Sequence, residues 1–133
     1  MPQRVCKRTL FLSVSLLIAA AAGCKRPGSG QAEIVITPEA AKEAQEIFAA
    51  RCSTCHGLTG QGDGPGSAAL TPKPRNFTDK MWQSNVTDKH IETIIQFGGA
   101  AVGKSPTMVA NPDLVSKPAV VAALRAHIRS LGK

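Results

Sequence analysis

Two cysteines separated by two residues and followed at once by a histidine constrain this chain more than any other feature. Cys52, Cys55 and His56 form the pattern C-x-x-C-H. Two thiols at this spacing can add to the two vinyl groups of one haem, and the histidine then lies under the iron as an axial ligand. The motif therefore predicts a covalently held haem and a fold that wraps around it.

Other uses of a C-x-x-C pair fit the chain less well. A thiol–disulfide redox pair is typical of a βαβ context, and the sequence has no strand pattern around the motif. A zinc site needs further ligands, and only His90 and His127 remain as histidines. Because the two cysteines enclose so short a loop, we expect no structural disulfide.

Residues 1–23 have the layout of an export signal of the lipoprotein type. A basic start precedes an apolar run over residues 10–22, which is too short for a comfortable membrane span. The run ends in Ala21-Ala22-Gly23-Cys24, which is similar to a bacterial lipobox, where the cysteine is lipidated and becomes the mature N-terminus. Leucine is usual at the position of Ala21. Ordinary signal-peptidase cleavage near residues 20–22, or an uncleaved anchor, remains the alternative.

Removing this signal leaves about 110 residues, a length at which a core without a cofactor is only modestly stable. We expect a flexible tether over residues 24–36 and one domain over 37–133. The formal charge is +7, and because three basic residues leave with the signal, it falls to +4 in the mature chain. This excess is scattered along the sequence, so it predicts no nucleic-acid partner. An acidic docking face on a partner protein is compatible with it.

Apolar periodicity predicts an all-α domain of three main helices joined by long loops. The first spans about 38–51, the second begins at Thr87 or Asp88 and ends at Gly98, and the last follows Pro118, with Arg125 and Arg129 on the outside. The glycine- and proline-rich stretch over 57–77 is a loop, of a length that is reasonable when it wraps a cofactor. The apolar faces are Ala40, Ala44, Ile47 and Phe48 in the first helix, Ile91, Ile94 and Ile95 in the second, and Val120 or Val121, Leu124, Ile128 and Leu131 in the last.

The motif and the segments around it resemble the single-haem class I cytochrome c family. The run from Glu39 to Gly57 looks like the N-terminal helix of that family entering its haem site, with Ala44 and Phe48 where this helix crosses the last one. The resemblance covers about residues 38–131. It implies the small cytochrome c fold, in which the N- and C-terminal helices pack together around one haem c.

Two methionines of the mature chain compete for the second axial position. Met108 lies in Ser105-Pro106-Thr107-Met108, a non-helical stretch that can bring a thioether over the haem face opposite His56, as the ligand loop of cytochromes c does. Val109 departs from the family, which more often has proline after the ligand. Met81 is expected to pack as a soft core residue. We therefore expect His56 and Met108 to bind the iron.

Several further residues invite a functional interpretation. In cytochromes c a proline carbonyl supports the proximal histidine, and Pro65, Pro72 and Pro74 are equal candidates here. Arg75 and Trp82 either contact haem propionates or are an ordinary loop residue and an ordinary core residue.

Two patterns are expected to carry no chemistry. Residues 98–105 match G-x-x-x-x-G-K-[ST], but that phosphate-binding loop requires a preceding strand, and here a helix precedes it and Pro106 follows, so we expect no nucleotide partner. His90 and His127 are expected to be ordinary side chains, with bis-histidine ligation as the alternative.

These features predict an electron carrier, not an enzyme, which shuttles single electrons between redox partner proteins at the periplasmic face of a bacterial membrane, held there by a lipid on Cys24. Two alternatives stay open. If no methionine binds the iron, the domain is a five-coordinate haem sensor for a small ligand. If the tether serves to keep it in place, it is a fixed cytochrome subunit of a respiratory complex.

Overall fold

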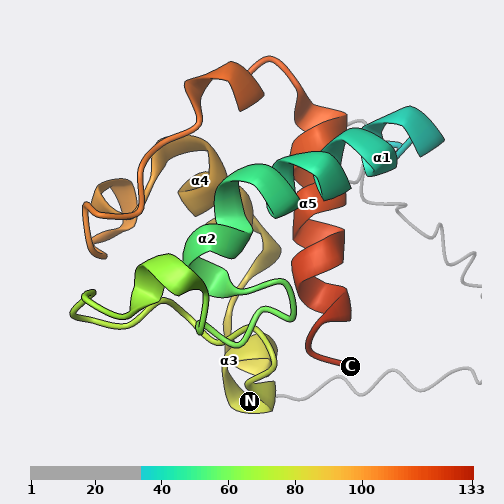
Figure 1. The fold of residues 1–133 in the computed structure, drawn as a ribbon. Coiled ribbons are helices and arrows are strands. Elements are labelled where there is room, and N and C mark those ends of the chain that lie inside the picture. Colours follow the sequence, from blue (N-terminus) through green and yellow to red (C-terminus); the bar gives the residue numbers. More distant parts are fainter. Residues whose placement is uncertain (1–33) are drawn as a thin grey trace, which may run out of the picture. The chain divides into compact units, whose positions relative to one another are not determined.

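The computed structural model describes residues 34–133. The expected signal over 1–23, Cys24 and most of the expected tether lie outside the described residues. Within them the chain is helical and contains no strand (Figure 1). The all-α prediction is therefore confirmed for the domain. No helix in this part of the chain combines the length and apolar character that crossing a membrane requires.

The first and last helices cross each other and form the centre of the core (Figure 1). Helix α1 (Pro38–Ile47) begins as predicted, with the Thr37 hydroxyl accepting a hydrogen bond from the Ala40 N–H at 3.2 Å. Helix α5 (Pro118–Ser130) also begins at the predicted proline. The apolar faces of both helices are buried together with Phe48, the residue that follows α1, and the helix residues involved are Ala40, Ala44, Ile47, Val120, Val121, Leu124 and Ile128.

Helix α4 (Asp88–Phe97) has the predicted boundaries because its capping signals are local. The Thr87 hydroxyl accepts from the His90 N–H at 3.1 Å, and Gly98 ends the helix with a positive φ of 77°. Ile91 and Ile95 are buried in the same core as α1 and α5. The second and third predicted helices are thus confirmed.

Two features of the helices differ from the sequence-based expectation. The first helix does not stop near residue 51, because the chain continues through a π-helical turn, η1 (Phe48–Cys52), into α2 (Ser53–His56). A short helix, α3 (Lys80–Asn85), was not predicted. It has no buried residue of its own, so apolar periodicity could not reveal it, but the Asp79 carboxylate caps it by accepting from Met81 N–H and Trp82 N–H.

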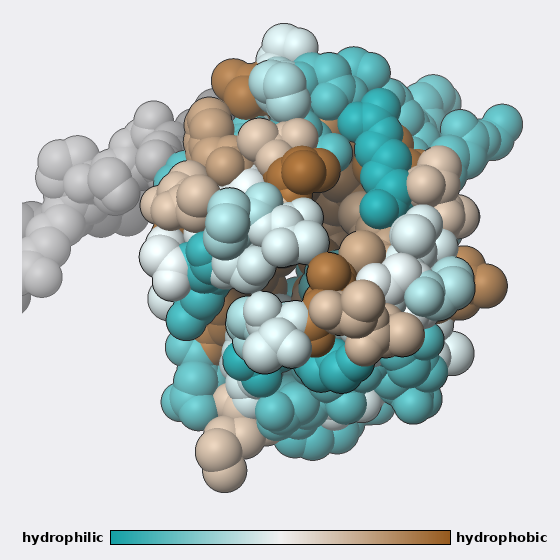
Figure 2. Space-filling view, turned by 60° about the vertical axis from the view of Figure 1, so that its left-hand side comes forward, coloured by the Kyte–Doolittle hydropathy of each residue, from teal (hydrophilic) through white to brown (hydrophobic). Residues whose placement is uncertain are grey.

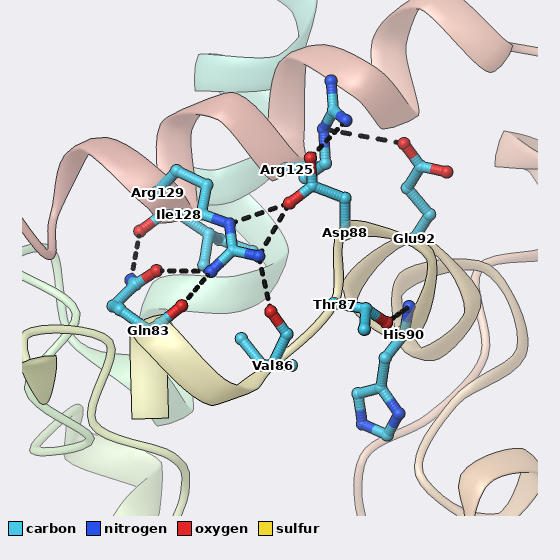
Figure 3. Close-up of polar contacts among 9 residues, drawn as sticks. All are labelled: Gln83, Val86, Thr87, Asp88, His90, Glu92, Arg125, Ile128 and Arg129. Atoms are coloured by element: carbon cyan, nitrogen blue, oxygen red, sulfur yellow. Dashed lines mark hydrogen bonds and ion pairs between the residues drawn. The ribbon is translucent and has the colours of Figure 1, made fainter. Parts of the chain in front are cut away.

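The arginines on α5 are less exposed than predicted. The side chains of Arg125 and Arg129 are only 27% and 26% exposed, because both pair with Asp88 at the start of α4. Arg129 donates hydrogen bonds to the Asp88 carboxylate at 2.7 and 2.9 Å (Figure 3). Hydrogen bonds from Arg129 hold the pKa of Asp88 below its ordinary value. These contacts fix α5 against the start of α4.

Candidate functional site

The C-x-x-C-H residues lie on one continuous stretch of helix that changes its winding at the motif. In η1 the Ser53 N–H donates to the Phe48 carbonyl, five residues back, instead of to Ala49. The Ser53 hydroxyl donates to the Ala49 carbonyl at 2.7 Å and so occupies the acceptor that this change leaves without its helical partner. Wide turns of this kind are frequent at functional sites. Here the turn ends at Cys52 and leads directly into the short helix with Cys55 and His56.

The motif presents two free thiols, and burial makes the first of them poorly suited to redox chemistry. Cys52 and Cys55 are both half-buried and neither forms a disulfide. Burial raises the pKa of the Cys52 thiol to about 11. Reactive redox cysteines have a lowered pKa instead, so this thiol is poorly suited to redox exchange and remains available for thioether formation.

The ring of His56 is buried, neutral and oriented by a backbone carbonyl. Its exposed fraction is 8%, and desolvation by burial lowers its pKa despite an opposing hydrogen bond to Arg75. The Nδ1 atom lies 3.0 Å from the Arg75 carbonyl oxygen, which requires the Nδ1–H tautomer. The Nε2 atom then carries a free lone pair. This is the arrangement of a histidine metal ligand whose other nitrogen is held by an acceptor.

The expectation that a proline supplies this carbonyl was wrong. Pro65, Pro72 and Pro74 do not hydrogen-bond His56, whereas Arg75, the residue after Pro74, does. Every residue has a carbonyl oxygen, so side-chain identity cannot reveal which one accepts the bond. The path of the loop decides this, and it brings Arg75 to the ring.

The glycine-rich loop after the motif folds back onto α2 and holds its C-terminal end. Gly62 N–H donates to the His56 carbonyl at 2.8 Å, and Gly64 N–H donates to the Cys55 carbonyl at 3.2 Å. Gly57 has a φ of 76°, and a side chain there would collide with the Asp63 carboxylate. The loop therefore satisfies the carbonyls that the end of a helix leaves open and fixes the turn that carries His56.

Met108 lies half-buried in the loop between α4 and α5, and that loop is fastened to the end of α4. Gly99 N–H donates to the Met108 carbonyl at 2.8 Å. Gly98 permits the close approach, because a Cβ there would lie 2.7 Å from the same carbonyl oxygen. Asn111 adds two further bonds, from its N–H to the Gln96 carbonyl at 3.0 Å and from its amide to the Ile95 carbonyl at 2.7 Å.

These contacts also explain the G-x-x-x-x-G-K-[ST] pattern of residues 98–105. The first glycine, Gly98, ends α4, and a 3₁₀ turn (Ala100–Val102) comes next. A phosphate-binding loop would instead follow a strand and lead into a helix. The glycines at 98 and 99 hold the Met108 segment. The local conformation is therefore not that of a phosphate-binding loop.

A salt bridge joins the two sides of the site. Arg51, directly before Cys52, donates to both carboxylate oxygens of Asp113 at 3.0 and 2.9 Å. Asp113 belongs to the 3₁₀ turn η4 (Pro112–Leu114), which follows the Met108 segment. Hydrogen bonding to Arg51 holds the pKa of Asp113 below its ordinary value. The pair thus links the motif helix to the loop that carries Met108.

The remaining candidate ligands lie elsewhere. Met81 is 74% exposed on α3, so the expectation that it packs in the core was wrong. His90 lies in the first turn of α4 (Figure 3). The ring of His127 packs edge-on against Phe48 at 4.4 Å between ring centroids, and burial lowers its pKa. Among residues 34–133 no three histidine, cysteine or acidic side chains gather as a metal site would require.

The Arg75 guanidinium lies over the ring of Trp82. The Arg75 guanidinium carbon lies 5.9 Å from the centre of the Trp82 ring, and its Nη1 lies 3.9 Å from the Asp79 carboxylate. Trp82 is half-buried and packs against Phe77. Contact of either side chain with haem propionates stays one of the two open alternatives.

The surface between the motif loop and the Met108 loop is hollowed. Both loops lie on the left-hand side of Figure 1, and Figure 2 brings that side forward and shows a central hollow surrounded by apolar and neutral residues. An apolar hollow, two free thiols and a histidine with Nε2 available are the features that a covalently bound haem needs. The residues present therefore fit this group.

Comparison with known proteins identifies a family. The family model described as Cytochrome c matches residues 41–132. The matched segment begins in α1 and ends after α5, so it includes both crossing helices, the C-x-x-C-H motif and Met108. No curated protein matches the sequence.

Proposed function

The chain belongs to the cytochrome c family, and we propose that it is a carrier of single electrons whose haem iron is held between His56 and Met108. As a member of this family it binds haem c covalently and has a haem-based electron-transfer role. The observation that carries the proposal is the orientation of His56. Because its Nδ1–H is committed to the Arg75 carbonyl, its Nε2 is available to the iron.

The residues of the chain divide the work of holding and tuning this group. The haem, when bound, supplies the one-electron chemistry of its iron. Cys52 and Cys55 retain it, and His56 binds as a neutral imidazole. Met108 offers a thioether, which raises the reduction potential, from a loop that Gly98, Gly99 and Asn111 hold in place. No side chain is assigned a role in making or breaking substrate bonds.

The visible spectrum of the reduced wild-type protein tests this proposal. A haem held on both faces is expected to give the spectrum of a six-coordinate, low-spin haem c that does not change when carbon monoxide is added, because no coordination position is free. A prompt shift of the main absorption band under carbon monoxide would contradict the proposal and favour the five-coordinate sensor.

We further propose that the domain works outside the cytoplasmic membrane, in the periplasm, tethered by a lipid on Cys24. The support is the sequence alone: a basic start, an apolar run over 10–22 and the lipobox-like ending. Redox partner proteins are then expected at the membrane surface. Stable co-purification with other redox subunits after mild detergent would instead favour a fixed subunit of a respiratory complex.

Replacing Cys24 with serine tests the anchor. The Cys24→Ser variant is expected to move from the membrane fraction to the soluble periplasmic fraction with its haem content unchanged. Stable attachment needs more than one fatty chain, and the proposed site of these chains is Cys24. Cell fractionation and the mass of the mature N-terminus measure the effect. A wild-type protein that is freely soluble with an unmodified N-terminus would contradict the lipid anchor and leave the electron-transfer role standing.

A further inference from the structure

We propose that Gln83 is a positioning residue for His56 and acts through Phe77, an inference that rests on the proposed role of His56 as an iron ligand. Neither Gln83 nor Phe77 belongs to a sequence motif. The three residues lie on different segments, in α3, in the loop after the motif and in α2. What joins them is one ring contact and one hydrogen bond.

The ring contact is between Phe77 and His56. The two rings lie nearly parallel, with an interplanar angle of 14° and centroids 4.4 Å apart. Both residues are buried, at 6% and 8% exposure. The Arg75 carbonyl fixes the Nδ1 edge of the imidazole, and the Phe77 ring covers one of its faces. Together these contacts restrict rotation of the imidazole ring. Both come from one short segment of the loop, the one that contains Arg75 and Phe77.

The hydrogen bond is between the Gln83 amide and the Phe77 backbone. Gln83 Nε2 donates to the Phe77 carbonyl at 2.7 Å and to the Ile128 carbonyl at 2.9 Å. Phe77 N–H donates to the Gly60 carbonyl at 2.6 Å. Phe77 is therefore held on one side by the glycine-rich loop and on the other by Gln83, which ties the segment to α5.

Arg129 determines which way the Gln83 amide points (Figure 3). Its Nη1 donates to Gln83 Oε1 at 3.0 Å and to the Gln83 backbone carbonyl at 2.6 Å. A guanidinium can only donate hydrogen bonds, so the amide oxygen must face Arg129 and the amide nitrogen must face the two carbonyls. Arg129 is itself held by Asp88 and by the Val86 carbonyl at 2.7 Å.

This arrangement allows the positioning role to be separated from general stability. In Gln83→Glu the carboxylate still accepts from Arg129 but has no N–H, so the Phe77 and Ile128 carbonyls lose their donor. In the matched control Asp88→Asn, the ion pairs of Arg125 and Arg129 are weakened. Arg129 keeps its bonds to Gln83 and to the Val86 carbonyl, so both amide donations of Gln83 remain. Gln83→Glu loosens the segment beside His56, whereas Asp88→Asn weakens the contact between α4 and α5 and leaves that segment unchanged.

The experiment measures the His56 ring by NMR in the oxidised holoprotein of the wild type and both variants. In Gln83→Glu, solvent exchange of the His56 Nδ1 proton is expected to accelerate by about tenfold. The Phe77 carbonyl loses its donor, so the segment that also carries the Arg75 carbonyl opens more often. The iron-shifted ring resonances of His56 should move as well. In Asp88→Asn both readouts should stay at wild-type values, even where thermal stability falls.

Unchanged exchange and resonances in Gln83→Glu would overturn the proposal, as would equal changes in Asp88→Asn at the same loss of stability. If Gln83→Glu does not fold, Gln83→Met takes its place, since it also lacks the donor and keeps the side-chain length. The proposed ligand role fails separately: it is wrong if the His56 resonances of the wild type carry no shift from the iron.

Discussion

Replacing Cys52 and Cys55 together with alanine is expected to abolish covalent haem attachment. The two thioether bonds have no other thiol in the domain to form from, because residues 34–133 contain only these cysteines. The denatured wild-type polypeptide should be one haem heavier than its sequence, and acid–acetone extraction should leave that haem in place. In the double variant, both the added mass and the resistance to extraction should be lost completely.

A matched control keeps the thiols and changes only their neighbour. Ser53→Ala removes the hydroxyl that bonds the Ala49 carbonyl, but C-x-x-C-H is preserved. This variant is expected to keep its covalent haem. Haem that remains attached in the double alanine variant, or haem that is extracted from the wild type, would contradict the assignment of Cys52 and Cys55.

Replacing Met108 with alanine is expected to open one face of the iron. The oxidised protein should lose the weak absorption band near the red end of the spectrum that reports thioether ligation, and the reduced protein should bind carbon monoxide. The reduction potential should fall by some tenths of a volt, a sizeable part of the roughly 0.8 V range that axial ligands span. Visible spectroscopy and a redox titration measure all three effects.

Met81→Ala is the control for this experiment. Met81 is the other methionine of residues 34–133, and at 74% exposure it lies on the surface of α3. The Met81→Ala variant is expected to keep the band, the potential and the indifference to carbon monoxide. The opposite pattern would move the ligand to Met81. A wild-type protein without the band would favour the five-coordinate sensor.

Helices α4 and α5 show how far local patterns go. Each has an apolar stripe, and each begins at a residue that the sequence identifies: Thr87 as a cap and Pro118 as a first position. The starts of both helices and the end of α4 were predicted correctly because the signals lie within the helix or next to it. The π-helical turn before Cys52 has no such signal, and the sequence indicated only that a helix precedes the motif.

Helix α3 marks the opposite case. It has no fully buried residue. Half-buried Trp82 packs against Phe77, and the polar contacts of Gln83 reach α5 and the loop before α3. A polar side chain with distant partners leaves no periodic trace. The predicted core position of Met81 was also wrong. The prediction rested on its place beside Trp82 in the sequence, but neighbouring residues of a helix point in different directions, and Met81 is exposed.

The sequence by itself predicted haem attachment at Cys52 and Cys55 and the long helices of the domain, because a fixed motif spacing and an apolar period are both read within a few residues. The tertiary structure alone decided which carbonyl binds His56, which ring lies against it and which glycines hold the Met108 loop. The His56–Arg75 bond already joins residues 19 apart. Such contacts use carbonyls and amides that every segment carries, so only the path of the chain selects among them.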